Sequence, residues 1–522
     1  MTKWMKALLI LNLEIVLLVP TCTQTKMDRG YKSADQYWAE TGLDEKDFDA
    51  LLTRDNCEST QQMFLACVNA IGQAAERYQL AITPDGTFKK LGPQDISERL
   101  TEKKALEKWA QVFSNKQQVA QISFLDLWKK LKSEKVAAKE KSAVIAAGIN
   151  GFLSIYKDPH TYILPLAMYE EVIANSENRS SNAGFIARRL TDRLVVRKVL
   201  DGSPAALAGL KKGDQIFAIN GRSVGMLLPS QVAEAFRMRE ENRMALTVDR
   251  EGKKQYLEIM KFEKIYPSVT SKLLETGAEA KARVGLITLN KFGKSACEQT
   301  RTQLIGLIEQ NISGVLLDLR DNPGGQVEEA ACIINLFVNR GTYEFQTRYL
   351  DPKRTPDFYT AENDPVYNGP LAILINSGSA SASEIVAGSL RDLGRARLVG
   401  ERSFGKGSFQ DGKIWAINSK IALFETEGLY YFPSGWTPQL VGLEPDVKVD
   451  FNDADGQRED VLFHNPIMPL DNWSGPQNLA WLLEKDCTSE PTSLAASFDD
   501  PQMQKAEALL SCGAHHDRHG SL

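Results

Sequence analysis

The second half of the chain alternates short apolar runs with helical segments, and this alternation constrains the fold more than any other feature. From about residue 283 the runs VGLITL, GVLLDL and LAILIN are each followed by a helical pattern, as in CEQTRTQLIGLIEQ, VEEAACIINLFVN and SEIVAGSLRDL. Apolar strands separated by helices are typical of βα units around a sheet that is buried on both faces. The sequence therefore predicts an α/β domain over about residues 266–450.

The rest of the chain predicts further folding units, as a length of 522 residues suggests. In residues 25–180 apolar positions recur every three or four residues, which predicts a helical N-terminal region. Residues 181–265 contain short β-rich runs, the turns DGSPA, KKGD and NGR, and one helical segment, SQVAEAFRMR. Residues 451–522 carry two helical patterns, NLAWLLEKD and QMQKAEALLS, and are expected to form a C-terminal extension. The fold class expected is multidomain α+β.

The first residues have the order of a secretory signal. Lys3 and Lys6 precede an apolar run, Ala7 to Pro20, that is shorter than the roughly 20 residues of a membrane span. We expect residues 1–24 to direct export to the periplasm or another extracytoplasmic space. Membrane attachment stays open, because Cys22 lies where a lipoprotein cysteine would, although the preceding threonine is larger than such sites favour.

Charge and cysteine content narrow the partners and the chemistry. A net charge of −5 with 25% charged residues gives no electrostatic reason to expect nucleic acid. The six cysteines after Cys22 permit three disulfides in an exported protein, and neighbours in sequence are the natural pairs: Cys57 with Cys67, Cys297 with Cys332, and Cys487 with Cys512. Buried free thiols are the alternative for the second pair. No CxxC spacing occurs, and the closing HHDRHG is better explained as a frayed end than as a metal site.

A cluster of serines, SGSASASEIVAG, begins at Ser377 after an apolar run. Ser381 and Glu384 form an S-x-x-E capping box, which is a sufficient structural reason for a serine at that position. A strand, a tight turn and a helix N-terminus together also present a hydroxyl beside unpaired backbone N–H groups, which could hold an oxyanion. Ser381 is therefore a candidate both for a helix cap and for a nucleophile.

A nucleophilic serine needs a base, and lysine is better placed than histidine. Four of the five histidines lie in or near the tail. In ERSFGKGSFQ, Lys406 stands between two glycines, which let the backbone approach other groups closely. A lysine base must be neutral, so its pKa must fall from about 10.4 towards roughly 7 to 8. A lysine in a surface hairpin is the alternative.

These segments resemble the carboxyl-terminal processing proteases, also called tail-specific proteases, which use a Ser–Lys pair. SASASEI is similar to the family's serine motif, and GERSFGKGSFQ to its Gly-Lys-Gly loop ending in Gln, with Ser403 where Thr is usual. The resemblance implies that Ser381 is the nucleophile, Lys406 the base and Gln410 the orienting amide. It implies structural roles for the neighbouring serines, which are Ser377, Ser379 and Ser383.

Other motifs follow in the family's order over about residues 145–450. DLRDNPGG resembles the glycine turn that supplies an oxyanion-hole N–H, which implies Gly324 or Gly325 together with Ala382. GLYYFPSGWTPQLVGLEPDV is similar to the segment that closes the protease core. DPHTYILP resembles the motif before the binding domain and implies a structural role for His160.

Residues 199–224, VLDGSPAALAGLKKGDQIFAINGRSV, resemble a PDZ domain. Such domains hold a peptide's terminal carboxylate on backbone N–H groups and add its strand to a sheet edge. The resemblance implies a carboxylate loop that starts at Asn182, where Gly is usual, and continues through Ala183, Gly184, Phe185 and Ile186.

The expected function is that of a serine endopeptidase that cleaves near the C-termini of exported proteins. It needs no metal or organic cofactor, and its PDZ domain would bind the substrate tail and could gate activity. A non-catalytic PDZ adaptor that binds C-termini is the main alternative. A penicillin-recognising enzyme is disfavoured, because no KTG follows the S-x-x-K spacings at Ser154 and Ser403. An adaptor or activator protein and self-association remain open as partners.

Overall fold

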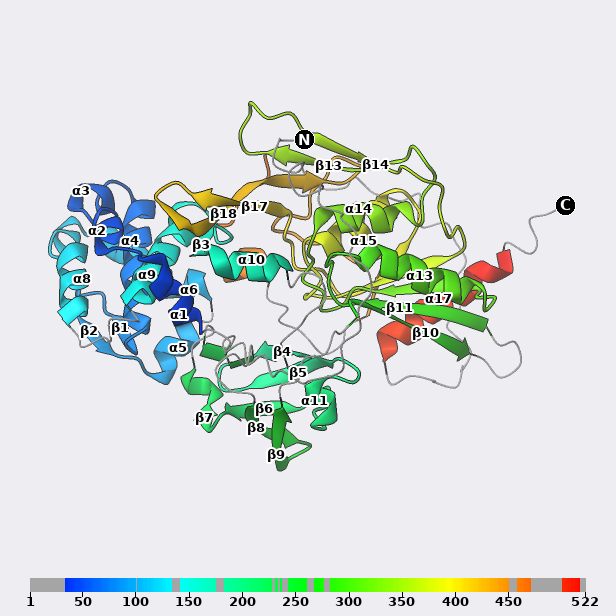
Figure 1. The fold of residues 1–522 in the computed structure, drawn as a ribbon, viewed down its shortest axis with the longest axis horizontal. Coiled ribbons are helices and arrows are strands. Elements are labelled where there is room, and N and C mark those ends of the chain that lie inside the picture. The colour runs from blue at the N-terminus through cyan, green and yellow to red at the C-terminus, as the bar shows by residue number, and fades with distance from the viewer. Residues whose placement is uncertain are drawn as a thin grey trace, which may run out of the picture.

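The computed structural model describes residues 33–99, 101–133, 141–174, 183–227, 231–232, 235–236, 243–260, 267–276, 282–449, 458–470 and 500–516. The predicted signal, Asn182 and the helix expected in NLAWLLEKD lie outside these ranges. The expected fold class is confirmed: a helical N-terminal domain, a small β domain and an α/β core follow one another along the chain (Figure 1). Of the helices described, none has both the length and the apolar character that crossing a membrane requires.

The N-terminal domain is built on two long apolar helices that pack against each other, α4 (Gln61–Glu76) and α9 (Lys141–Tyr156). Gly148 lets α9 approach the small helices before α4, since a Cβ there would lie 2.3 Å from the ring of Phe48. The other elements are α1 (Ala34–Thr41), α2 (Glu45–Asp49), α3 (Arg54–Cys57), β1 (Leu80–Ile82), β2 (Phe88–Lys90), α5 (Pro93–Arg99), α6 (Glu102–Phe113), α7 (Lys116–Val119) and α8 (Phe124–Ser133).

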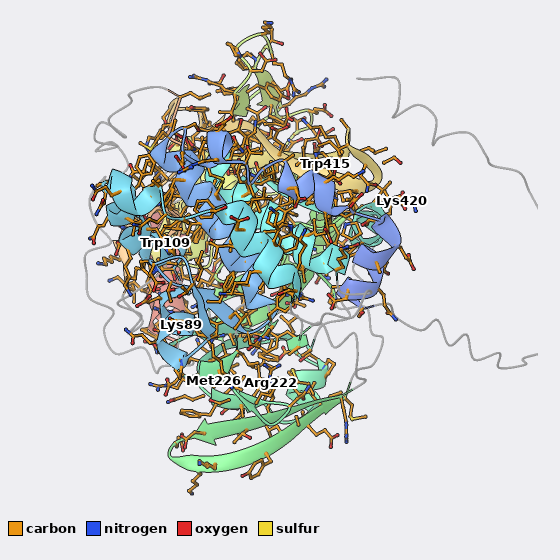
Figure 2. All side chains as sticks on the ribbon, turned by 90° about the vertical axis from the view of Figure 1, so that its left-hand side faces the viewer. Lys89, Trp109, Arg222, Met226, Trp415 and Lys420 are labelled. Carbon is orange, nitrogen blue, oxygen red and sulfur yellow. A yellow bond between two sulfur atoms is a disulfide. The ribbon has the colours of Figure 1, made fainter. Side chains whose placement is uncertain are left out.

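The small domain is a β sheet whose first strand forms an edge. The strand order is β4-β5-β6-β8-β9, with β7 paired to β6. Its elements are β4 (Phe185–Arg189), β5 (Leu194–Val199), α11 (Pro204–Leu207), β6 (Gln215–Ile219), β7 (Arg222–Ser223), η2 (Val224–Met226), β8 (Arg243–Arg250) and β9 (Lys253–Met260). Figure 2 shows Lys89 of the helical domain above Met226 and Arg222, where the two domains approach each other.

The core is the βα sheet that the sequence predicts. Its order is β10-β11-β12-β15-β16-β19, and every pair is parallel except β10 with β11. The strands are β10 (Val269–Thr276), β11 (Ala282–Leu289), β12 (Gly314–Asp318), β15 (Leu371–Ile375), β16 (Arg397–Gly400) and β19 (Val447–Lys448). All five residues of β12 and of β15 are buried, as expected of strands covered on both faces.

Different parts of the chain cover the two faces of this sheet. One large core packs against α13 (Ala296–Ile308), α14 (Val327–Asn335) and α15 (Ala382–Asp392). On the other face Leu316, Leu374 and Val399 pack against Ala506 and Leu510 of α17 (Pro501–His516). The last helix, predicted to lie in an extension, is thus part of the core's packing (Figure 1).

A second sheet joins the core to the helical domain. Its order is β14-β13-β18-β17, formed by β13 (Tyr343–Tyr349), β14 (Asp357–Thr360), β17 (Ser408–Trp415) and β18 (Asn418–Tyr431). β18 also pairs with β3 (Tyr162–Pro165), which precedes α10 (Leu166–Ala174). The far end of the β17–β18 hairpin reaches α1, where Lys420 Nζ donates to the carbonyl of Glu40 (3.1 Å; Figure 2).

Two of the three predicted disulfides lie within the described residues and are formed. Cys57 is joined to Cys67 beside α4, and Cys297 to Cys332 between α13 and α14. The alternative of free thiols at Cys297 and Cys332 is therefore wrong, because the packing of the two helices brings them together. Cys487, half of the third pair, lies outside the described ranges.

Candidate active site

Ser381 lies in the turn that leads from β15 into α15. Its backbone has φ 55° and ψ −119°, a conformation that few residues other than glycine adopt. Gly324 lets the two segments approach closely, since a Cβ at that position would lie 2.8 Å from the Cβ of Ser381. A strained serine between a strand and a helix is the geometry that presents a hydroxyl above a sheet.

The neighbouring serines have other tasks. Ser379 and Ser383 are fully buried, and their hydroxyls donate to the carbonyls of Leu319 and Asn322 (2.8 Å each). Ser377 lies in the preceding turn. The two buried hydroxyls tie the serine turn to the segment that follows β12.

Lys406 lies in the loop between β16 and β17. Its Nζ donates to the carbonyl of Ser408 and to Oε1 of Gln410, both at 2.8 Å. Burial lowers the pKa of Lys406 to about 8, although the carboxylates of Glu459, Glu384 and Asp158 oppose the shift. In the described part of the chain no hydrogen bond joins Nζ to the hydroxyl of Ser381.

Gln410 is held in one orientation by a chain of polar side chains. Its Nε2 donates to the hydroxyls of Ser408 (3.1 Å) and Thr426 (3.2 Å), and the Thr426 hydroxyl donates to Asp158 (2.8 Å). This leaves Oε1 facing the lysine amine. Asp158 begins the DPHTYILP motif, which explains why a segment far away in sequence matters to the lysine.

Glu384 ties the serine turn to the lysine loop. One carboxylate oxygen accepts from the backbone N–H groups of Ser381 (3.0 Å) and Lys406 (2.9 Å), and the other from the hydroxyl of Ser403 (2.5 Å) and the N–H of Gly405 (2.8 Å). Burial raises the pKa of Glu384 to about 7, against these four hydrogen bonds. The predicted capping-box glutamate therefore positions both loops.

Tyr430 makes a second tie between the same loops. Its buried hydroxyl lies 2.8 Å from the carbonyl oxygen of Lys406 and 3.2 Å from that of Ser381. Sequence reasoning assigned no role to this tyrosine. The only signal was its place in the segment that the family resemblance describes as closing the core.

The glycine turn after β12 lies against the start of α15. The N–H of Gly324 donates to Oδ1 of Asn322 (2.9 Å), so it is already engaged. The N–H groups of Gly325 and Ala382 donate to no acceptor in the described ranges. A parallel bridge to Phe292 fixes Gly325, where an added Cβ would lie 2.2 Å from the Phe292 carbonyl oxygen. Of the two glycines, Gly325 is the better candidate for an oxyanion donor.

His160 lies in a buried polar network beside the lysine loop. Its Nε2 is 3.3 Å from Oε1 of Glu459, and its ring packs edge-on against Phe463. The same Glu459 oxygen accepts from Gln439, whose own Oε1 accepts from the N–H of Gly407 (2.7 Å). Through Glu459 and Gln439, His160 thus belongs to the network that binds the backbone of the lysine loop at Gly407.

The predicted carboxylate loop leads into the edge strand β4. Gly184 has a φ of 78°, and a Cβ there would lie 2.2 Å from the Cβ of Ser203. The carbonyl of Ala183 accepts from the N–H of Ala205 (3.0 Å). Phe185 packs against Phe236 at 4.8 Å, and Ile186 follows in β4 opposite Lys198. The loop is thus held firmly against the start of α11.

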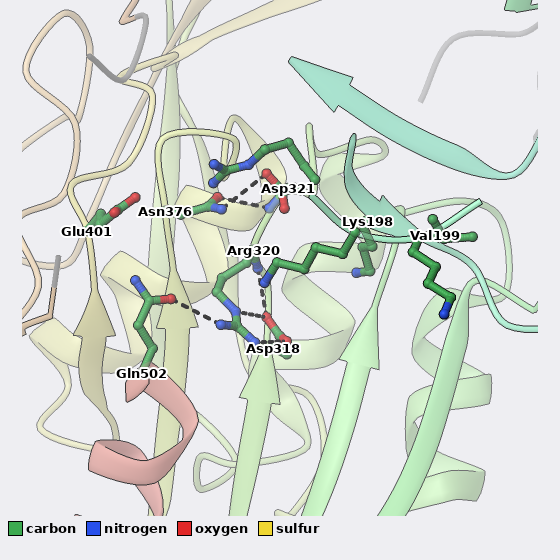
Figure 3. A pocket seen from close by; sticks show the side chains of 11 residues that line it. Lys198, Val199, Asp318, Arg320, Asp321, Asn376, Glu401 and Gln502 are labelled. Atoms are coloured by element: carbon green, nitrogen blue, oxygen red, sulfur yellow. Dashed lines mark hydrogen bonds and ion pairs between the residues drawn. The ribbon is translucent and has the colours of Figure 1, made fainter. Parts of the chain in front are cut away.

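The small domain meets the core at a charged cavity of about 350 Å³ (Figure 3). Lys198 projects from β5 towards Asp318 and Asp321; its burial lowers its pKa, and the two carboxylates oppose this. Arg320 binds Asp318 (2.7 Å) and, from the start of α17, Asp500 (2.7 Å). Asp318, Arg320 and Asp321 lie at the end of β12 or just after it, directly before the glycine turn.

Residues 283–449 match the model of peptidase family S41. They include the serine turn, the glycine turn and the lysine loop. The chain thus contains a peptidase S41 domain. Residues 195–250 match the PDZ domain model. The resemblance to the carboxyl-terminal processing proteases is confirmed.

Known relatives match about two thirds of the chain. A Staphylococcus aureus protein named Probable CtpA-like serine protease is 30% identical over 358 residues, which cover 66% of this chain and 66% of the relative. The Carboxy-terminal-processing protease of Bartonella bacilliformis is 29% identical, covering 63% of this chain and 74% of its own length. The solved photosystem II D1 C-terminal processing protease is 24% identical, with a TM-score of 0.47 over 63% of this chain and 87% of that one. The chain thus spans 64–66% of the length of the staphylococcal relatives, which is just under two thirds.

Proposed function

We propose that this S41 protein is a serine endopeptidase that cleaves polypeptides near their C-termini, with Ser381 as nucleophile and Lys406 as general base. The observation that carries the proposal is the double tie between their loops, in which Glu384 and Tyr430 each contact the backbone of both residues. Such ties keep two reacting groups in register. The substrates are proposed to be exported proteins, encountered outside the cytoplasm after removal of the predicted signal.

The hydrogen bonds of Lys406 suit a neutral amine. A neutral amine has two N–H donors and one lone pair, and Ser408 and Gln410 accept from both donors. The lone pair is then left to take a proton. A pKa of about 8 keeps roughly one lysine in ten neutral at pH 7, which is the condition a lysine base must meet.

In the proposed reaction the Ser381 hydroxyl oxygen attacks the scissile carbonyl while its proton passes to Nζ of Lys406. The N–H groups of Ala382 and Gly325 hold the oxyanion. As the tetrahedral intermediate collapses, the C–N bond breaks and Lys406 returns the proton to the leaving amine. Water, deprotonated by the same lysine, then hydrolyses the ester and restores the serine.

The PDZ domain is proposed to hold the substrate tail. β4 pairs on one side with β5 and forms the edge of its sheet, the position to which an extended peptide adds. The loop of Ala183, Gly184, Phe185 and Ile186 would receive the terminal carboxylate. A gating role is supported by Lys198, which faces the segment leading to the glycine turn.

One observation favours the alternative, a PDZ adaptor without protease activity. Within the described residues, Lys406 donates to Ser408 and Gln410 and makes no hydrogen bond to Ser381. We interpret this as a resting arrangement, because catalytic hydrogen bonds are often long until substrate binds.

A gel time course tests the two functions. A protein with an apolar C-terminal tail is incubated with wild type, Ser381→Ala and Lys406→Ala, and binding of the tail is measured in parallel. The protease proposal expects cleavage by wild type alone and binding by all three proteins. Substantial cleavage by Lys406→Ala would refute the base. Binding without cleavage, together with no labelling of Ser381 by a serine-directed fluorophosphonate, would favour the adaptor.

A further inference from the structure

A cavity of about 890 Å³ lies between α14 and the β13–β14 hairpin, apart from the serine and lysine loops. Three glutamates and a single arginine line it, so its wall carries an excess of negative groups. The lining residues that matter here are Glu328, Glu344, Glu362, Arg340, Phe358 and Tyr359.

Glu344 is the residue that points to a ligand. It is only 2% exposed, and its Oε1 has no hydrogen-bond partner in the described part of the chain. Burial, together with the nearby carboxylate of Glu362, raises the pKa of Glu344 to about 8. A buried acceptor without a donor is unfavourable, and the cost disappears when a ligand supplies the donor.

The surroundings of Glu344 form a built site. Asn335 fixes the rim: its Oδ1 accepts from the N–H groups of Glu362 and Asn363 (3.2 Å each), and its Nδ2 donates to the carbonyl of Asn363 (2.7 Å). On the opposite wall Tyr359 stacks on Phe345, with ring centroids 4.2 Å apart. The backbone that carries Glu362 and one aromatic wall are therefore held in place before any ligand arrives.

The chemistry of the wall selects the ligand. Carboxylate acceptors need a donor, and an excess of carboxylates favours a cation. In the described residues no group of three or more His, Cys, Asp or Glu side chains is arranged to hold a metal ion. The aromatic side chains of the wall favour an organic cation. Aromatic faces such as that of Phe358, which is 66% exposed, attract guanidinium and ammonium groups.

We propose that this cavity binds a guanidinium or alkylammonium group, with Glu344 as its direct acceptor and Glu362 and Glu328 as further negative groups. The cation has two sources, a lysine or arginine side chain of a polypeptide and a free amine. Binding of a polypeptide side chain would concern the proposed protease activity directly, because α14 lines the cavity and begins two residues after Gly325, a proposed oxyanion donor. The proposal does not rest on the proposed catalytic function, and its test uses protein that cannot cleave.

The experiment is calorimetric titration of the full chain carrying Ser381→Ala with agmatine, a small guanidinium amine. We expect saturable binding that Glu344→Gln weakens at least tenfold and that the matched control Glu309→Gln, on an exposed residue, leaves unchanged. Glutamine has the shape of the protonated glutamate, so the fold should be kept. Absence of saturable binding at about 10 mM agmatine, or equal binding by Glu344→Gln, would overturn the proposal.

A second variant tests the same cavity independently of Glu344→Gln. A pair of peptides then identifies the source of the cation. Ala331→Arg, on α14 in the cavity wall, should abolish agmatine binding by placing a tethered guanidinium there; undiminished binding by this variant contradicts the site. A peptide with one arginine should bind at least tenfold more tightly than its neutral citrulline counterpart if polypeptides are the source. Agmatine binding without that preference assigns the site to free amines, and the cation chemistry stands.

Discussion

Replacing Glu459 by glutamine should make the enzyme faster at neutral pH. Glu459 is fully buried, and its charge is the largest influence that holds the pKa of Lys406 up against burial. Glutamine keeps the oxygen that accepts from Gln439, and its amide group replaces Oε2, an atom with no hydrogen-bond partner among the described residues. The change therefore removes one negative charge at small structural cost.

The direction and size of the effect follow from the titration of the lysine. The base is active when neutral, so the rate rises with pH through its pKa and is constant above it. In wild type this pKa is about 8. Loss of a nearby opposite charge lowers a lysine pKa by about one unit. At pH 7 the neutral fraction then rises from about one tenth to about one half, so kcat/KM should increase roughly fivefold, with no change above pH 9.

The assay is kcat/KM for a quenched fluorescent peptide with an apolar C-terminal tail, measured from pH 6 to pH 10 in one buffer series. Glu58→Gln, which removes a partly exposed charge from the helical domain, is the matched control and should retain the wild-type profile. Near-UV circular dichroism of both variants verifies the fold. An unchanged or higher apparent pKa in Glu459→Gln would refute the assignment of the titrating base to Lys406.

Three other changes test the packing around the site. Tyr430→Phe removes the hydroxyl that contacts both loops; the unfolding free energy should fall by about 1–2 kcal/mol in urea titrations, and kcat should fall more than tenfold at nearly constant KM. Gly324→Ala places a methyl group 2.8 Å from the Cβ of Ser381, so turnover should fall at least a hundredfold while calorimetry still detects tail binding. Replacing both Cys297 and Cys332 by serine should lower the unfolding free energy by about 2–4 kcal/mol, and an unchanged urea midpoint would contradict the structural role of that disulfide.

Local patterns predicted the parts of the fold that depend on neighbouring residues. The runs at β12 and β15 were predicted as buried strands because they are apolar throughout, apart from Asp318 at the end of β12. Position in space was harder to predict. Nothing in QMQKAEALLS indicates that α17 returns to cover β12 and β15, and nothing in β17 and β18 indicates that their hairpin reaches α1, because both depend on contacts between residues far apart in sequence.

The candidate site shows the same division. Ser381, Lys406 and Gln410 lie on short motifs, and the structure brings Lys406 and Gln410 into direct contact. The residues that join these motifs in space were harder to predict from the sequence. Glu384 was predicted only as a helix cap, and Tyr430 had no predicted role, because their contacts cross from one loop to another and leave no spacing in the sequence.

The cover that α17 provides has a consequence for how the chain is made. Strands β11 to β19 are complete when residue 448 has been synthesised, but the helix that covers one face of their sheet is not complete until residue 516. In the interval Leu316, Leu374 and Val399 have no apolar neighbours from that helix. A nascent chain therefore exposes an apolar sheet face until residues 501–516 are added, and a folding chaperone should bind chains truncated before α17 in preference to chains that include it.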